Sequence, residues 1–262
     1  MSPPQRILIL GGTGEARELA AALVAAGADV ISSLAGRVSQ PRLPVGPVRV
    51  GGFGGADGLA GYLRAEQVTV LVDATHPFAA TITANAALAA ATAGLPRLVL
   101  RRPAWDEGQA GDSARPWQLV PDIQAAADAV RSWPGEGVFL TTGRRDLAAF
   151  ATDGGHQFLV RTVDPPEGPV PPRMTLLLDR GPYTVAGESG LIREHRIGLL
   201  VTKNSGGPLT AGKLDAARDL GLPVVMVRRP DRPDVPLRST PDEAARWLAE
   251  VCGDGHVAPD GA

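Results

Sequence analysis

Short apolar runs alternate with longer stretches of mixed apolar and polar residues along most of the chain. Short apolar runs bounded by Gly or Pro are typical of buried strands, and the longer stretches have the length and spacing of helices. A regular alternation of strand and helix predicts a parallel sheet covered by helices, an α/β fold. The expected strands of the first part are 7–10, 29–34, 48–50, 68–73 and 98–101, and its expected helices are 15–26, 58–66 and 78–93.

The pattern lapses between residues 103 and 115 and then resumes as a second series of the same kind. We therefore expect two domains, 1–103 and 104–252, followed by a disordered tail over 253–262. The periodicity leaves open whether a terminal element crosses from one sheet to the other. The expected strands of the second series are 118–120, 138–141, 157–163, 174–178, 198–202 and 224–228, and its expected helices are 123–133, 146–151, 183–195, 211–220 and 241–251.

Length and charge set broad bounds on this picture. The 262 residues are enough for one large or two ordinary domains. The net charge is -2, with 26 Lys and Arg against 28 Asp and Glu, so no overall field attracts nucleic acid or a membrane surface. No segment has the pattern of a secretory signal or a membrane span, which favours a cytoplasmic protein.

The single cysteine, Cys252, excludes an internal disulfide and a multi-thiolate metal site, and it fits a reducing compartment. Its place in the last expected helix favours a role as buried filler over a reactive thiol. The 4 His residues are scattered, and the chain has neither a nucleophile elbow nor a P-loop. Metal-assisted hydrolysis and P-loop phosphoryl transfer are therefore disfavoured, and we expect no metal site.

A glycine turn follows the first expected strand. Gly11, Gly12 and Gly14 lie between that strand and a helix that is expected to begin at Glu15. Glycines let the chain approach an anion closely, and backbone N–H groups at a helix start attract phosphate. The turn therefore predicts a nucleotide cofactor, although Arg17 stands where a dinucleotide fingerprint has its third glycine. A tight turn without a ligand is the alternative.

The end of the second expected strand indicates which dinucleotide binds. An acid there bonds the ribose hydroxyls of NAD, whereas Arg and hydroxyl side chains receive the extra phosphate of NADP. Asp29 lies at the opposite end of this strand, while Ser32, Ser33 and Arg37 lie at or just after its tip. We therefore expect NADPH rather than NADH. A solvated loop charge is the alternative role of Arg37.

A second junction follows the largely apolar expected strand 68–73. It brings Asp73, Thr75 and His76 to the carboxyl end of the strand, where ligands bind in such sheets. Pro77 suits the first turn of a helix, so Thr75 or His76 is expected near the N-cap. The alternative is that Thr75 only caps this helix and His76 is a turn residue.

Four glycines between residues 51 and 55 follow the third expected strand. Such a flexible run is tolerated most readily where the backbone must approach another group closely, which makes Gly52 and Gly54 candidates for cofactor contact. A mobile loop with Asp57 capping the next helix is the alternative.

Two strand ends in the second series have the composition of anion sites, because hydroxyls, glycines and cations meet there near a helix start. A substrate with several carboxylates would suit them, and Arg101 and Arg102 could add positive charge. Some of these cations must instead be solvated loop charges. The Pro-rich stretch 164–172 is expected to be a loop that could form a rim or lid. The candidate residues are Thr142, Gly143, Arg144, Lys203, Asn204, Ser205 and Gly206.

Together these segments resemble the precorrin-6A reductase family of cobalamin biosynthesis, including its cobalt-precorrin-6A-reducing relatives. The resemblance covers nearly the whole chain. Its most specific motif is Asp73-Ala74-Thr75-His76-Pro77-Phe78-Ala79. Where relatives often carry Glu-Gly-Arg after the first turn, this chain has Glu15-Ala16-Arg17. The other segments that carry it are 11–20, 33–37, 51–55, 141–143 and 201–207.

The resemblance implies two Rossmann-like, doubly wound parallel-sheet domains with an inter-domain cleft. NADPH would lie on the first domain and a tetrapyrrole-derived macrocycle between the two. Hydride would pass to C19 of precorrin-6A or cobalt-precorrin-6A and a proton to C18, giving precorrin-6B. Neither nucleic acid nor a membrane is an expected partner, and a monomer is favoured over a homodimer.

The resemblance also suggests roles for the candidate residues. Thr75 and His76 would lie near the nicotinamide and the substrate, with His76 as the titratable candidate for the proton donor unless solvent serves. A non-redox lyase or transferase acting on a related tetrapyrrole and an NADPH-sensing binding module are the alternative functions. The expected cofactor contacts are Gly11, Gly12, Thr13, Gly14, Glu15, Ser33, Arg37, Gly52, Gly54 and Asp73.

Overall fold

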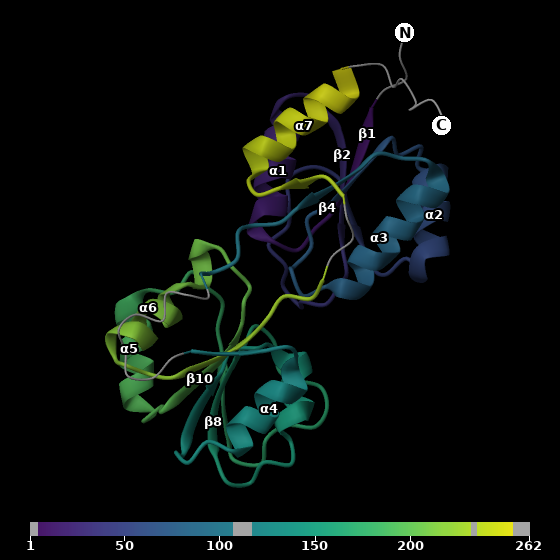
Figure 1. The fold of residues 1–262 in the computed structure, drawn as a ribbon. Helices are drawn as coiled ribbons and strands as arrows, with labels where there is room; N and C mark the ends of the chain where they lie inside the picture. The colour runs from purple at the N-terminus through teal and green to yellow at the C-terminus, as the bar shows by residue number, and fades with distance from the viewer. Residues whose placement is uncertain (1–4, 107–116, 232–234, 254–262) are drawn as a thin grey trace. The chain divides into compact units, whose positions relative to one another are not determined.

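The computed structural model describes residues 5–106, 117–231 and 235–253. The chain forms two compact units (Figure 1). The first contains the chain up to Arg102 together with the chain from Asp231 onward, and the second contains Pro103–Pro230. Each unit is built on its own sheet of six parallel strands, so the expected α/β fold with two Rossmann-like sheets is confirmed.

The sheet of the first unit has the strand order β12-β5-β4-β1-β2-β3. Helices cover both of its faces, with α1 beside α7 on one face and α2 beside α3 on the other (Figure 1). The strands are β1 (Arg6–Leu10), β2 (Asp29–Leu34), β3 (Val48–Val50), β4 (Val70–Asp73), β5 (Arg97–Leu100) and β12 (Leu237–Arg238), and the helices are α1 (Gly14–Ala25), α2 (Gly55–Ala65), α3 (Ala80–Ala93) and α7 (Pro241–Gly253).

Strand β1 is apolar at nearly every position because both of its faces are buried. Successive side chains of a strand point to opposite faces. Ile7 and Ile9 accordingly pack in the cluster under α1 and α7, whereas Leu8 and Leu10 pack in the cluster under α2 and α3. The continuous apolar run that predicts the strand is thus a consequence of a sheet covered on both sides.

The C-terminal elements belong to the first unit, which corrects the expected second domain of 104–252. Strand β12 pairs with β5, with Leu237 opposite Val99. Helix α7 buries Ala244 and Leu248 against α1. The physical reason is that α1 alone leaves part of this sheet face uncovered, and the apolar stripe of α7 completes the cover. The expected tail over 253–262 lies outside the described residues, except that Gly253 ends α7.

The lone cysteine has the environment that was expected for it. Cys252 lies in α7, partly buried against the same apolar cluster. Burial raises the pKa of the Cys252 thiol. A thiol whose pKa is raised is mostly protonated at neutral pH, so it is a weak nucleophile.

The sheet of the second unit has the strand order β6-β11-β10-β7-β8-β9. A buried ion pair joins β8 to α5: Nη1 and Nη2 of Arg161 lie 2.5 and 2.9 Å from the carboxylate oxygens of Glu188. The strands are β6 (Gln118–Val120), β7 (Gly137–Leu140), β8 (Gln157–Thr162), β9 (Met174–Leu178), β10 (Leu199–Lys203) and β11 (Val224–Val227), and the helices are α4 (Ile123–Arg131), α5 (Val185–Glu194) and α6 (Gly212–Asp219), with 3-10 turns η1 (Arg144–Phe150) and η2 (Pro208–Thr210).

The start of α3 differs from the sequence expectation. The helix begins at Ala80, after an N-cap residue, Ala79, that makes no side-chain cap bond. Pro77 is therefore not in the first helical turn, and the prediction that Thr75 or His76 lies near the N-cap is wrong. The intervening residues form a turn instead, closed by the Ala79 N–H, which donates to the His76 carbonyl at 2.8 Å.

The placement of α7 can be tested through Leu248, which is 1% exposed. Leu248→Ala should lower the free energy of unfolding by about 2–5 kcal/mol, because it removes buried methyl groups and leaves a cavity. Leu88→Ala is the matched control, since Leu88 lies in α3 and is 60% exposed, and its effect should stay within about 0.5 kcal/mol. Urea denaturation measures both. Equal effects of the two substitutions would contradict the packing of α7.

Candidate functional site

The carboxyl ends of β1 and β4 form the topological switch point of the first sheet. From β1 the chain proceeds to β2 and β3 on one side, and it then crosses to β4 on the other side of β1. Leu10, the last residue of β1, pairs with Asp73, the last residue of β4. Ligands of open α/β sheets bind in the crevice at such a point. The fold therefore brings the predicted glycine turn and the Asp73–His76 segment to one edge.

A single hydroxyl ties these two segments together. Thr13 is buried, and its Oγ1 donates to the Ala74 carbonyl at 2.8 Å while it accepts from the Ala16 N–H at 3.1 Å. The second bond makes Thr13 the N-cap of α1. Because the hydroxyl is engaged on both sides, the backbone of the turn is the part of Thr13 that can meet a ligand.

The glycine turn presents bare backbone. Gly12 has a φ of +114°, and a Cβ added there would meet no atom within 4 Å, so the backbone at this point faces open space. Gly14 is the first residue of α1, which puts the start of the helix beside the turn. Open backbone at a helix N-terminus is the geometry that binds phosphate.

Glu15 has a partner within the first unit. Its Oε2 lies 3.0 Å from Nη1 of Arg102, and both side chains are largely buried. An acid in the first turn of a helix is also favoured by the helix dipole. The predicted cofactor contact of Glu15 stays a prediction, and the structure gives this residue and Arg102 a role in holding the start of α1.

Asp73 orients Thr75. Its Oδ1 accepts from the backbone N–H of Thr75 at 3.1 Å and from the Thr75 hydroxyl at 2.7 Å. Its Oδ2 is buried and has no hydrogen-bond partner within the described part of the chain. Burial lowers the pKa of the neighbouring Arg97 guanidinium, and the Asp73 charge opposes this shift. A buried carboxylate oxygen without a partner at a ligand-binding edge is suited to accept a ligand hydroxyl or amide.

His76 is exposed, and its ring orientation is set by the turn. Nδ1 accepts from the backbone N–H of Phe78 at 3.3 Å. Nδ1 must be unprotonated to accept, so the neutral ring carries its proton on Nε2. Nε2 is therefore the nitrogen that can exchange a proton with a ligand.

The glycine run after β3 is fixed by Arg49. The guanidinium of Arg49 donates to the carbonyls of Gly51 and Gly52, each at 2.6 Å, and lies over the Phe53 ring at 3.9 Å. Gly54 is the N-cap of α2, so the alternative that Asp57 caps this helix is wrong. An added Cβ at Gly52 or Gly54 would meet nothing within 4 Å, which leaves their contact with a cofactor a prediction.

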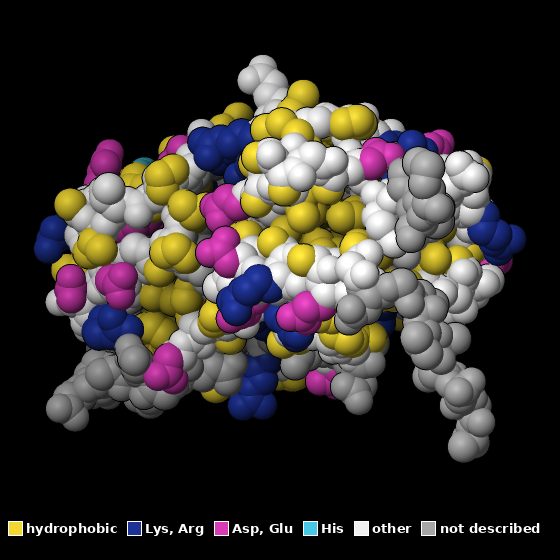
Figure 2. Space-filling model, turned by 90° about the horizontal axis from the view of Figure 1, so that it is seen from above, with side chains coloured by type: hydrophobic (Ala, Val, Ile, Leu, Met, Phe, Trp, Pro, Cys, Tyr) yellow, Lys and Arg dark blue, Asp and Glu magenta, His cyan; other side chains and the backbone are white. Residues whose placement is uncertain are grey.

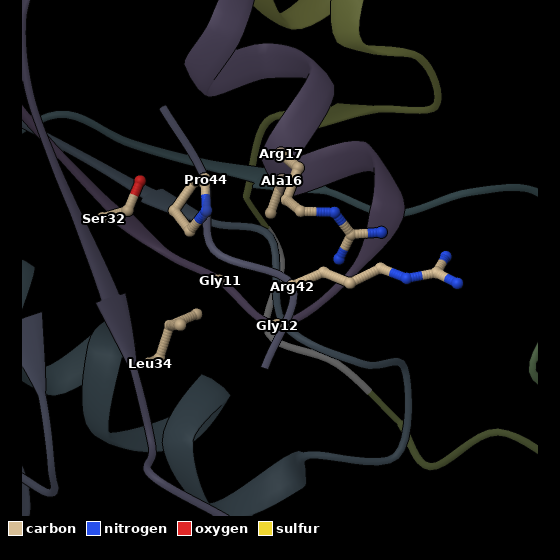
Figure 3. Close-up of a pocket in the computed structure, with 8 residues that line it drawn as sticks. All are labelled: Gly11, Gly12, Ala16, Arg17, Ser32, Leu34, Arg42 and Pro44. Carbon is tan, nitrogen blue, oxygen red and sulfur yellow. The ribbon is translucent and has the colours of Figure 1, made fainter. Parts of the chain in front are cut away.

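A pocket lies beside the glycine turn (Figure 3). Alternation along β2 brings Ser32 and Leu34 to this pocket, while the predicted Ser33 points to the other face of the sheet. Arg37 does not line the pocket, and two arginines that were not assigned to the cofactor do: Arg17 and Arg42. The lining residues are Gly11, Gly12, Ala16, Arg17, Ser32, Leu34, Arg42 and Pro44.

The second sheet has a switch point of its own between β7 and β10. The chain runs from β7 to β8 and β9 on one side and returns to β10 on the other. At these strand ends, Nζ of Lys203 lies 2.5 Å from Oδ2 of Asp146. Thr142 is buried, and its Oγ1 has no hydrogen-bond partner among the residues that the structure describes. Gly143 has a φ of +95° and open space where a Cβ would be.

Arg144 contacts the Pro-rich loop, which is a loop as expected. Its Nη1 lies 3.9 Å from Oδ2 of Asp164 and 3.7 Å from Oε1 of Glu167, and it donates to the Pro165 carbonyl at 3.3 Å. The cations at this edge, Arg144 and Lys203, are therefore paired with carboxylates of the protein itself. Sequence reasoning did not anticipate Asp146, Asp164 or Glu167 as their partners.

Asn204 and Gly206 make close contacts within the second unit. Both polar side-chain atoms of Asn204 are engaged, since Oδ1 accepts from the Trp105 N–H at 2.8 Å and Nδ2 donates to the Trp105 carbonyl at 3.2 Å. A Cβ at Gly206 would lie 2.0 Å from the Pro103 carbonyl oxygen. The Ser205 carbonyl accepts from Arg229 Nη2 at 3.0 Å. These residues shape the loop after β10, and their contact with substrate stays a prediction.

The described residues contain no helix long and apolar enough to span a membrane. Nor do they contain a group of three or more His, Cys, Asp or Glu side chains placed to hold a metal ion. On the face drawn in Figure 2, Lys and Arg side chains are interspersed with Asp and Glu side chains rather than gathered into one large charged area.

A sequence model described as precorrin-6x reductase, CbiJ/CobK, matches residues 6–249. The chain belongs to the precorrin-6x reductase family. The resemblance read from the sequence motifs is thereby confirmed.

Relatives of this family match nearly the full chain. The precorrin-6A reductase of Rhodococcus erythropolis is 56% identical over 94% of this chain and 97% of its own length. The precorrin-6A reductase of Mycobacterium tuberculosis is 52% identical over 93% of this chain and 97% of its own length. The cobalt-precorrin-6A reductase of Priestia megaterium is 26% identical over 86% of this chain and 90% of its own length. A solved structure of a CobK precorrin-6A reductase superposes with a TM-score of 0.85, at 41% identity, over 94% of this chain and 96% of that one.

The role of Thr13 can be tested by stability. Thr13→Ala removes the N-cap bond and the bond to Ala74, and it should lower the free energy of unfolding by about 1–2 kcal/mol. Thr13→Ser keeps the hydroxyl and should recover most of this loss. Chemical denaturation of both variants measures the difference. Equal losses would indicate that the methyl group, rather than the two hydrogen bonds, is what matters at this position.

Proposed function

We propose that the protein is an NADPH-dependent precorrin-6A reductase, which transfers hydride to C19 and a proton to C18 of the macrocycle and forms precorrin-6B. Membership of the reductase family supports the reaction class. The observation that carries the cofactor assignment is the bare backbone at Gly12, at the start of α1 and at the switch point of the first sheet.

The residues at this edge suit a dinucleotide. The backbone N–H groups of Gly12, Thr13 and Gly14 would hold the pyrophosphate, with the α1 dipole favouring its negative charge. Asp73 keeps Thr75 in a fixed orientation and retains Oδ2 for a further hydrogen bond. When bound, NADPH supplies the hydride, and the protein supplies position, charge compensation and exclusion of water.

His76 is a candidate proton donor at this edge. The hydrogen bond from the Phe78 N–H to Nδ1 leaves the proton of the neutral His76 ring on Nε2. Imidazole is the side chain that most often acts as a general acid or base in enzymes. We assign His76 this role, with solvent as the competing source of the proton.

The substrate carboxylates would bind at the second switch point. We assign this role to Lys203, Arg144 and Thr142, whose hydroxyl has no hydrogen-bond partner among the described residues. Because Lys203 and Arg144 already pair with protein carboxylates, binding would exchange one ion pair for another.

The metal-free macrocycle is the favoured substrate. The relatives of 44–56% identity are named precorrin-6A reductases, whereas those named cobalt-precorrin-6A reductases are 26–28% identical. We therefore propose precorrin-6A, rather than its cobalt complex, as the substrate.

The purified wild-type protein tests this function directly. NADPH should bind below millimolar concentration, and its absorbance at the nicotinamide band should fall when anaerobically prepared precorrin-6A is added. Absence of binding at millimolar NADPH would contradict the reductase assignment and leave a non-redox tetrapyrrole enzyme. Binding without oxidation by any precorrin would instead indicate an NADPH-sensing module.

A substitution of Glu167 tests whether substrate carboxylates replace the protein's own carboxylates beside Arg144. Oε1 of Glu167 lies 3.7 Å from Nη1 of Arg144, and the Glu167 side chain is 89% exposed. Glu167→Gln should lower the KM for precorrin-6A by about 1.5- to 5-fold, the range expected for one weak surface pair. The control is Glu194→Gln, at the end of α5, which should leave KM unchanged. Steady-state kinetics measures both. A rise in KM for Glu167→Gln would place Glu167 among the groups that favour substrate binding.

A further inference from the structure

Strand β9 forms an edge of the second sheet, and no strand in the described part of the chain pairs with its outer side. The other three edge strands, β3, β6 and β12, have only two or three residues, whereas β9 has five. Proteins usually protect an edge by a very short strand, a charge or a proline, because unpaired N–H and C=O groups recruit another strand. The sequence of β9, Met-Thr-Leu-Leu-Leu, contains neither a charge nor a proline, so this edge is open to a partner.

The pairing of β9 with β8 fixes which backbone groups face that partner. The carbonyl of Arg173 accepts from the Phe158 N–H of β8 at 2.8 Å. At the other end, the N–H of Asp179 donates to the Thr162 carbonyl of β8 at 3.0 Å. Successive residues of a strand direct their backbone groups to alternate sides, so the odd-numbered residues face β8. The residues whose N–H and C=O groups point outward are Met174, Leu176 and Leu178.

The charges that flank β9 are complementary to those of a second copy of the same strand. Arg173 directly precedes the strand and Asp179 directly follows it, and both are exposed. In an antiparallel pair centred on Leu176, Arg173 of each copy lies opposite Asp179 of the other copy. Opposite charges that face each other across two strands are favourable. The flanking residues therefore favour a second copy of this chain as the partner.

The same register also satisfies the backbone. It sets Leu176 opposite Leu176 of the second copy and Met174 opposite Leu178, so outward-facing groups meet outward-facing groups and each pair can exchange two hydrogen bonds. A shift of the register by one residue would oppose outward-facing groups to groups that already bond β8. A shift by two residues would separate Arg173 from Asp179. Backbone and charges thus select one register.

The apolar side chains agree with this arrangement. Met174, Leu176 and Leu178 lie on one face of β9, because alternate side chains of a strand share a face. Leu178 is 51% exposed in the single chain. In the dimer each of these side chains would lie beside an apolar side chain of the second copy, which would remove apolar surface from water.

We propose that the protein forms a twofold homodimer through antiparallel pairing of β9 with β9 of a second copy. A twofold contact uses the same surface on both copies and therefore closes at two. Two five-residue strands make a small interface, so the association should be weak and concentration-dependent. The inference does not depend on the proposed function, and the monomer that the sequence favours is the competing outcome.

Sedimentation equilibrium of the full-length protein between about 1 and 500 µM tests the dimer, since this range spans the affinities of weak complexes. The variants are Arg173→Asp, Asp179→Arg and the double variant that carries both changes. Arg64→Asp is the matched control, because it makes the same change of charge at an exposed position of α2 in the first unit. Thermal unfolding of each variant checks that it is folded.

Each single reversal should raise the dimer dissociation constant about 5- to 100-fold, because two attractive cross-strand pairs become repulsive. The double variant exchanges the two charges and restores both pairs, so its dissociation constant should return to within about threefold of the wild type. Arg64→Asp should match the wild type.

Amide hydrogen exchange followed by NMR tests the strand pairing itself. Leu178→Lys places a charge on the edge at an exposed position and should give a monomer. The amides of Met174 and Leu176 should exchange slowly in the wild-type dimer and rapidly in this variant. The amides of Thr175 and Leu177, which face β8, should stay protected in both.

Three results would overturn the inference. The first is a wild-type protein that stays monomeric over the whole concentration range. The second is a dimer whose dissociation constant responds equally to Arg173→Asp and Arg64→Asp, or is not restored in the double variant. The third is a dimer in which the amides of Met174 and Leu176 exchange as rapidly as in Leu178→Lys.

Discussion

The hydroxyl of Thr13 is the interaction on which the candidate cofactor edge depends. Parallel pairing of β1 with β4 brings the two loops near each other, but pairing ends at Leu10 and Asp73. Beyond that point, the bond from Thr13 to the Ala74 carbonyl joins the loops, and the bond from the Ala16 N–H fixes where α1 starts. Gly12 can then face open space in a backbone conformation that is held from both sides.

The sequence was sufficient to predict most of the strands and the candidate residues at their carboxyl ends, whereas the two switch points follow from the strand order in the structure. Strands covered on both faces read as unbroken apolar runs, and β1, β4, β7 and β10 are of this kind. The glycine turn was equally readable, because a tight turn into a helix restricts the residue types that can form it. The glycine turn and the other strand ends of the same sheet lie close together because parallel pairing places the carboxyl ends of all strands at one edge.

Other features depend on contacts that a linear pattern does not encode. Strand β12 has only two residues, so no periodicity marks it, and its partner β5 lies far away in the chain. Whether Ser32 or Ser33 faces the pocket depends on which alternate side chains of β2 point to that face of the sheet. Because two serines follow each other near the end of β2, the sequence pattern does not decide between the two faces. Asn204 resembles a ligand residue in the sequence, yet the backbone of Trp105 engages both ends of its amide.

The internal ion pairs of Lys203 and Arg144 have a consequence for selectivity among anions. A small anion such as chloride or acetate that reaches either cation must displace a tethered carboxylate and gains only one contact in return. A multivalent guest replaces several such contacts in one binding event, so its later contacts form at high effective concentration. If substrate carboxylates bind here as proposed, the tethered carboxylates would discriminate against abundant monovalent ions while keeping both cations in position.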